Sequence, residues 1–220
     1  MHEDLKYFKL AKELNEKWKN KFLIKKNEVH VRGNIKSLSL ISLSSEKPEI
    51  GFSGLRTDIT FDDKLKKLKN REVGRSTPEK KLQSFIIRNA IINKYQLIFD
   101  NNIKFITSEI AVYNENNKRI VNDILGFSDG CIYVIELKSD RAMGRLIEQV
   151  NNFENIINEK KDFFYELMEL YDYIWDRKSI KKIIIWPEIE NSRKSSKELS
   201  NKNIIEYLYT EEYEFIKYEK

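Results

Sequence analysis

The sequence predicts a mixed α/β protein in which a central mixed sheet is flanked by helices. Three observations predict this class. A clear helix start at Thr77 is followed by an apolar helical face. Three strand patterns then follow between residues 103 and 138, and a long helical pattern separates them from the continuous apolar run Ile183–Trp186. We therefore expect one core with the element order αβββαβ, and an N-terminal α+β appendage formed by residues 1–71.

The N-terminal appendage differs from the core in its sequence pattern. Residues 4–22 place apolar side chains at helical spacing, which predicts an amphipathic helix. Residues 28–61 contain short β-branched or alternating runs between glycines and a proline, which predicts a small β-meander. Residues 62–75 are rich in lysine and are typical of a linker or a short exposed helix. We expect two domains, with residues 1–71 serving recognition, dimerisation or sensing and residues 72–220 carrying the chemistry.

The core begins with a helix that has a strong N-terminal signal. Thr77 can cap this helix, Pro78 suits its first turn, and Glu79 is favoured near the positive end of the helix dipole. The apolar residues that follow cover a wide face, so we expect the helix to pack on two sides; they are Leu82, Phe85, Ile86, Ile87, Ala90 and Ile91.

Three strands are predicted after this helix, in a meander. The first is Ile103–Tyr113, and the second and third are Ile120–Phe127 and Cys131–Lys138. The turn signal Ser128-Asp129-Gly130 between the last two predicts an antiparallel hairpin.

A long helical pattern follows the hairpin, from Met143 to about Tyr173, with apolar residues at near-heptad spacing. The run Ile183–Trp186 is typical of a buried strand. Because a crossover helix joins this strand to the hairpin, we expect a parallel, right-handed connection. The tail is predicted to hold a short helix at residues 204–208 and a strand at residues 213–218.

The composition limits the functional classes. The chain has 220 residues, and its 40 basic and 35 acidic residues leave a net charge of +5, which allows binding to a polyanion without requiring it. The single cysteine, Cys131, excludes an intrachain disulfide and fits a reducing, cytoplasmic setting. No apolar run approaches the roughly 20 residues that span a bilayer, and residues 1–20 are too charged for a signal peptide. No glycine-rich phosphate loop is present, and His2 and His30 are too few for a zinc site.

The main candidate site lies on the predicted hairpin. Side chains alternate between the two faces of a strand, so Glu136 and Lys138 point to the same side of an otherwise apolar strand. The hairpin can bring Asp123 close to Glu136. Two carboxylates and an ammonium group would then converge, an arrangement suited to holding a hard divalent cation beside a water molecule. The alternative is an ordinary surface Glu–Lys pair, which contributes little energetically.

Asp123 followed by Glu136-Leu137-Lys138 resembles the D…(D/E)-x-K signature of the PD-(D/E)XK nuclease superfamily. The resemblance covers residues 77–186 and departs from the signature at Asn122, where the superfamily has a proline. It implies a restriction-endonuclease-like core, with Mg²⁺ held by Asp123, Glu136 and the backbone carbonyl of Leu137, and with Mn²⁺ able to substitute. It also implies that Lys138 orients the attacking water, helped by a pKa lowered beside the metal.

Three further residues are candidates for the same site. Gln149, four residues before Phe153, is similar to the first residue of the Q-x-x-x-Y motif of RecB-like members, although it could be an ordinary glutamine on a helix face. Arg145 could reach a phosphate or be solvated. Glu79 corresponds in chain order to a glutamate near the metal in many members, but it also fits a capping box with Ser76.

These observations lead to a functional hypothesis. We expect a Mg²⁺-dependent nuclease that hydrolyses DNA, an endonuclease of a restriction, defence or repair system, acting without a membrane. A homodimer is allowed but not required. Two alternatives stay open, a catalytically silent nucleic-acid-binding or assembly module on the same fold, and an RNA nuclease.

Overall fold

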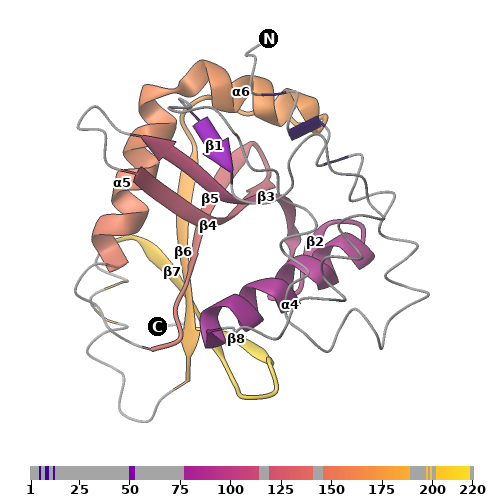
Figure 1. Ribbon diagram of the computed structural model, residues 1–220, viewed down its shortest axis with the longest axis vertical. Coiled ribbons are helices and arrows are strands. Elements are labelled where there is room, and N and C mark those ends of the chain that lie inside the picture. Colours follow the sequence, from indigo (N-terminus) through magenta and orange to yellow (C-terminus); the bar gives the residue numbers. More distant parts are fainter. Residues whose placement is uncertain are drawn as a thin grey trace, which may run out of the picture.

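The computed structural model describes residues 5, 8, 9, 12, 50–52, 77–113, 119–140, 146–188, 197, 199 and 202–218. Their strands form one curled, mixed sheet with the order β1-β3-β4-β5-β6-β7-β8, and β2 pairs with β3 outside this path (Figure 1). The helices are α4 (Pro78–Ile92), α5 (Leu146–Glu159) and α6 (Lys161–Leu170). The strands are β1 (Ile50–Phe52), β2 (Gln96–Leu97), β3 (Asp100–Tyr113), β4 (Arg119–Ser128), β5 (Cys131–Leu137), β6 (Ile180–Pro187), β7 (Ile204–Tyr209) and β8 (Phe215–Lys217).

The predicted hairpin is confirmed. Strands β4 and β5 pair antiparallel, with Ser128 opposite Cys131, so only two residues turn the chain. Asp129 and Gly130 both have positive φ, 48° and 73°, as the tight turn of a two-residue hairpin requires. The register runs as far as Ile124 opposite Ile135. This register brings Asp123 of β4 beside Glu136 of β5 in the sheet.

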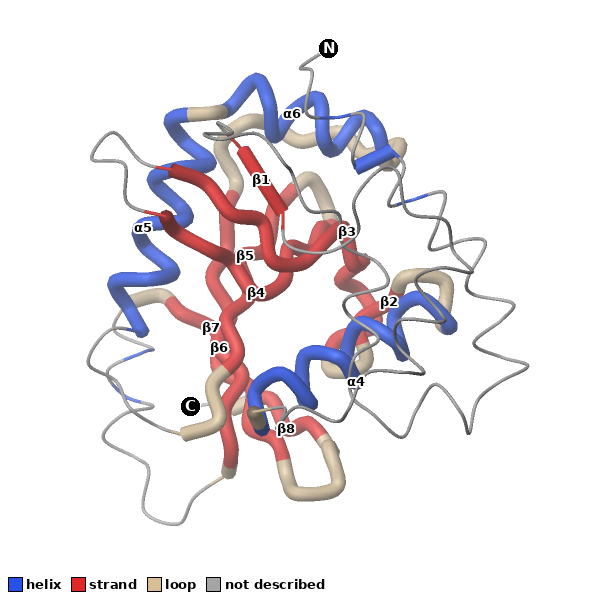
Figure 2. Tube along the Cα trace, viewed as in Figure 1, coloured by secondary structure: helices blue, strands red, loops and turns tan. Residues whose placement is uncertain are grey.

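The predicted parallel connection is also confirmed, and its right-handedness stays a prediction. After β5 the chain passes through α5 and α6 and returns as β6, which pairs parallel to β5. The apolar run Ile183–Trp186 is fully buried within β6. Helix α5 contacts β4 and β5, whereas α4 contacts β2, β3 and β5. In Figure 2 the sheet lies between α4 and the pair α5–α6.

The prediction of one long helix is wrong, because the helix is interrupted at Lys160. Helix α5 ends at Glu159, and Lys160 has a non-helical φ of −111° and ψ of 40° before α6 begins. Two adjacent aromatic side chains are buried after the break. Phe164 packs edge-on against Phe153 of α5, while Phe163 packs edge-on against Phe8. The near-heptad spacing continues across this break, so spacing alone could not reveal it.

The predicted short helix at residues 204–208 is also wrong, because these residues form strand β7. They pair parallel with β6, from Lys182 opposite Ile204 to Pro187 opposite Tyr209. The segment IIEYLY is rich in β-branched and aromatic residues, and pairing with a strand whose centre is fully buried outweighs any helical preference of so short a run. The predicted tail strand is present as β8, antiparallel to β7.

The described residues of the N-terminal appendage pack with the core. Leu5 and Phe8 are buried in the same hydrophobic cluster as the sheet residues, and Nζ of Lys12 donates a 2.8 Å hydrogen bond to the carbonyl of Leu170. Strand β1 pairs antiparallel with the far end of β3. The rest of the predicted N-terminal helix and meander lies outside the described residues. The division at residue 71 stays a prediction, but the contacts join both sides of it into one core.

No helix in the described ranges is long and apolar enough to cross a membrane.

Substituting Phe8 by alanine tests whether the appendage completes the core. Phe8 is fully buried against Phe163, so Phe8→Ala should lower the free energy of unfolding by about 3–5 kcal/mol. The measurement is chemical denaturation, with Ile174→Ala as the control because Ile174 is 81% exposed. Equal, small losses in both variants would show that the core folds without the appendage.

Candidate active site

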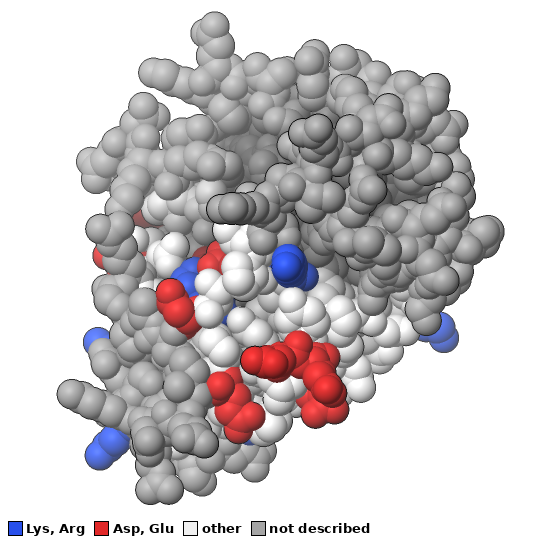
Figure 3. All heavy atoms as spheres, turned by 60° about the horizontal axis from the view of Figure 1, so that its bottom comes forward, with Lys and Arg blue, Asp and Glu red and all other residues white. Residues whose placement is uncertain are grey.

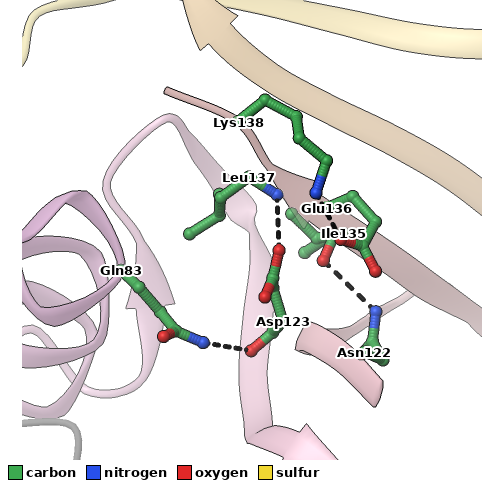
Figure 4. A network of polar contacts seen from close by, with 7 residues as sticks. All are labelled: Gln83, Asn122, Asp123, Ile135, Glu136, Leu137 and Lys138. Atoms are coloured by element: carbon green, nitrogen blue, oxygen red, sulfur yellow. Dashed lines mark hydrogen bonds and ion pairs between the residues drawn. The ribbon is translucent and has the colours of Figure 1, made fainter. Parts of the chain in front are cut away.

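The candidate site lies where β4 and β5 stop pairing through their backbones. The last paired residues are Ile124 and Ile135, and beyond them side chains take over as hydrogen-bond partners. The backbone N–H of Leu137 donates to Oδ2 of Asp123 at 2.9 Å. Nδ2 of Asn122 donates to the carbonyl of Ile135 at 3.2 Å (Figure 4). The two strands are therefore held together by the side chains of Asn122 and Asp123, which leaves room between them for polar groups.

Helix α4 contacts this place through Gln83. Its Nε2 donates a 2.8 Å hydrogen bond to the backbone carbonyl of Asp123, and its side chain is almost completely buried. Glu79 lies one turn earlier on the same side of α4, because residues four apart in a helix are neighbours. Asp123 is thus held by Gln83 through its carbonyl and by Leu137 through its carboxylate (Figure 4).

Glu136 is the most buried acid of the site, with 2% of its surface exposed. Its burial, followed by the nearby charge of Asp123, raises the pKa of its carboxyl group well above the usual range, and Lys138 opposes this effect. Oε2 of Glu136 lies 3.3 Å from Nζ of Lys138. Oε1 is buried and accepts no hydrogen bond from the described residues, whereas a protonated Glu136 can hydrogen-bond to the carboxyl group of Asp123. When both acids are ionised this oxygen lacks a partner, which is costly, so a cation between the two carboxylates would stabilise the ionised pair.

Lys138 lies immediately after the last residue of β5. Its N–H donates to the carbonyl of Ile185 at 2.9 Å, which continues the pairing with β6. Burial alone would lower the pKa of its ammonium group, but the three carboxylates of Glu136, Asp123 and Glu79 outweigh burial and raise it. Without a bound metal, the ammonium group of Lys138 therefore stays charged and acts as a hydrogen-bond donor. The lowered pKa expected beside a bound metal stays a prediction.

The donor set fits a hard divalent cation. Asp123 and Glu136 offer carboxylate oxygens from adjacent strands. The N–H and C=O of one strand residue point to the same side, so the carbonyl of Leu137 faces the strand that carries Asp123. Mg²⁺ prefers such oxygen ligands and keeps several waters, so it does not need a cage of many side chains. No group of three or more His, Cys, Asp or Glu side chains suited to a metal occurs in the described part of the chain, so Glu79 does not complete one.

The remaining predicted site residues differ in whether they interact with this cluster. The charge of Glu79 contributes to the raised pKa of Lys138, after the larger contributions of Glu136 and Asp123. Gln149 is exposed on α5, and no hydrogen bond joins it to Asp123, Glu136 or Lys138 among the described residues. Phe153, four residues later, is fully buried in the core instead.

Arg145 lies outside the described residues, so its predicted contact with a phosphate stays a prediction.

The structure adds residues that sequence reasoning missed. Asn122 and Gln83 are the two side-chain amides of the site, and each is a polar residue within an otherwise apolar strand or helix face. A polar residue in such an apolar setting is a sequence signal that could have identified both amides. Tyr209 also contacts the site, through a hydrogen bond to the carbonyl of Lys138. It carried no signal, because the segment that precedes it was predicted to be helical.

No protein-family model matches this chain, and no curated protein is significantly similar to it.

The raised pKa of Glu136 predicts a pH dependence of stability. A folded-state pKa above the unfolded one means that ionising Glu136 costs stability as pH rises from its usual pKa through the raised one. Glu136→Gln cannot ionise, so in EDTA this variant should gain stability over the wild type between about pH 5 and about pH 8. Chemical denaturation at both pH values measures the gain. Glu154→Gln, which removes an acid on α5 that pairs with Lys182, is the control. Parallel behaviour of the wild type and Glu136→Gln would contradict the assigned burial cost.

Proposed function

We propose that the chain is a Mg²⁺-dependent nuclease with a restriction-endonuclease-like core, which hydrolyses phosphodiester bonds in DNA. The observation that carries this proposal is the convergence of Asp123, Glu136 and Lys138 where β4 and β5 separate. The burial of Glu136 beside Asp123, with an Oε1 that accepts no hydrogen bond from the described residues, supports a cation ligand there. The motif resemblance supplies the substrate class, and it extends to a function in restriction, defence or repair, in the cytoplasm.

The order of elements also supports the proposal. Helix α4 is followed by the antiparallel strands β3, β4 and β5, then by a helical crossover to the parallel strand β6. This is the αβββαβ order that the resemblance implies. Strands β7 and β8 extend the sheet beyond β6, and β1 extends it beyond β3.

Phosphodiester hydrolysis needs a nucleophile made from water at neutral pH and positive charge near the pentacovalent transition state. A Mg²⁺ ion held by Asp123, Glu136 and the carbonyl of Leu137 would supply both when bound. The protein contributes orientation, because the Leu137 N–H and the Gln83 amide hold Asp123 in place. Lys138 contributes a charged ammonium group beside Glu136, placed to orient the attacking water and to hold or release a proton there.

The surface charge restricts how a polyanion can approach. Acidic side chains gather on the face shown in Figure 3, which brings forward the end of the molecule with the β7–β8 hairpin and the start of α4. The hairpin carries three exposed glutamates, Glu211, Glu212 and Glu214. Like charges repel, so phosphates should not lie over this hairpin. We expect DNA to reach the acidic pair from a direction away from β8.

A cleavage assay tests the proposal. Plasmid DNA and RNA are each incubated with the protein, with Mg²⁺ or with EDTA. The wild type should cleave DNA only with Mg²⁺, and Glu136→Gln should lower the rate by about a hundredfold or more because a ligand charge is lost. Glu154→Gln should cleave normally, since its carboxylate pairs with Lys182, which lies opposite Val134 and not opposite Glu136. RNA cleavage alone would change the substrate class, and full activity of Glu136→Gln would refute the site.

The function of Lys138 can be separated from binding. Lys138→Ala should lower the cleavage rate by about a hundredfold while DNA affinity in a gel shift at fixed salt changes little, because one charge is a small share of phosphate contacts. Lys182→Ala is a matched control, since Lys182 is a lysine on the neighbouring strand β6, paired with Glu154 on α5. Binding of DNA without cleavage by the wild type would favour the catalytically silent module instead.

A further inference from the structure

Tyr209 links strand β7, which lies two strands from β5, to the candidate site. It ends β7, opposite Pro187 of β6, and β6 separates it from β5. Its side chain reaches across β6, and its hydroxyl donates a 3.3 Å hydrogen bond to the backbone carbonyl of Lys138. No motif that we identified in the sequence includes this residue.

The ring of Tyr209 is held in place by aromatic packing. Only 9% of the residue is exposed. Its ring lies 6.1 Å from that of Tyr213, which in turn packs 4.8 Å from Phe85 of α4. Burial, followed by the proximity of Tyr213, Glu79 and Asp140, raises the pKa of the hydroxyl. The hydroxyl is therefore a neutral donor over the working pH range.

Lys138 is the residue at which the chain leaves the sheet, so its backbone carbonyl needs a hydrogen-bond donor from a side chain. Its N–H is bound by Ile185 and its ammonium group lies beside Glu136. The contact from Tyr209 binds its carbonyl and so fixes the peptide that follows it. With both backbone groups of Lys138 bound, the direction in which its side chain leaves the strand is set.

We propose that Tyr209 is a positioning residue that fixes the end of β5 and thereby the ammonium group of Lys138. This inference rests on the proposed nuclease function, in which Lys138 orients the attacking water. It adds a residue from β7, which lies beyond the αβββαβ core, to the parts that a productive site requires.

A matched control lies on the same strand. Tyr207 is also buried, and its hydroxyl donates a 2.8 Å hydrogen bond to Oδ2 of Asp100 at the start of β3. Tyr207→Phe and Tyr209→Phe each remove one hydroxyl and keep the ring. They differ in whether the lost hydrogen bond reaches Lys138.

The first measurement is steady-state cleavage of DNA with Mg²⁺. Tyr209→Phe should lower kcat by about tenfold to a hundredfold with little change in KM, because partners of catalytic residues have effects of this size. Tyr207→Phe should leave kcat within about twofold of the wild type. Thermal denaturation of both variants shows whether a loss of stability explains the change. Equal kcat in the two variants would overturn the proposal.

The second measurement does not depend on activity. Lysines are methylated reductively with ¹³C, and the NMR signal of Lys138 is assigned by its absence in Lys138→Arg. This signal should shift or broaden in Tyr209→Phe and stay unchanged in Tyr207→Phe. If the wild type does not cleave nucleic acid, the nuclease proposal fails and this signal still decides whether Tyr209 positions Lys138. An unchanged signal in Tyr209→Phe would overturn the positioning inference.

Discussion

Burial of Glu136 beside a second, half-buried acid, Asp123, is the constraint on which this site depends. Glu136 is almost completely buried, and the charge of Asp123 lies close enough to raise its pKa further. Lys138 is the positive group that opposes this repulsion. Bringing such a cluster out of water costs stability unless charges are paired and hydrogen-bonded. Proteins keep costly arrangements of this kind mainly where a site requires them, which is the physical reason to interpret the pair as functional.

The surrounding elements meet that constraint from several directions. Strand β5 supplies Glu136 and the N–H of Leu137, and β4 supplies Asp123. Helix α4 adds Gln83, whose amide binds the backbone of Asp123. Strand β7 adds Tyr209, whose hydroxyl reaches the end of β5. Each of these contacts fixes a backbone group or an acidic side chain, so the geometry of the acids depends on how the helix and the sheet pack.

The hydrophobic core offsets the energetic cost of this polar cluster. Strand β5 is buried along its whole length, and Ile183, Ile184 and Ile185 of β6 are completely buried. Helix α5 covers part of the sheet, and its Phe153 packs edge-on against Phe164 of α6. Each buried aliphatic side chain contributes on the order of 2 kcal/mol of hydrophobic stabilisation. A large apolar core can therefore carry a small, destabilising polar cluster at its edge.

The sequence by itself determined the local parts of this protein. The cap at Thr77 predicts α4, the turn at Asp129-Gly130 predicts the β4–β5 hairpin, and the alternation along β5 puts Glu136 and Lys138 on one face. These features are set by residues close together in the chain, so a pattern can express them. The hairpin then places Asp123 beside Glu136, because its register follows from a two-residue turn.

Only the tertiary structure decided the rest. Beyond the break at Lys160, Phe163 packs against Phe8, a residue more than 150 positions away. Residues 204–209 form a strand because β6 offers them a partner, and no local pattern records that partner. The contacts of Gln83 and Tyr209 with the site likewise join segments far apart in the chain. Long-range packing and pairing select among local preferences that are individually weak, which is why the fold class was predictable and these contacts were not.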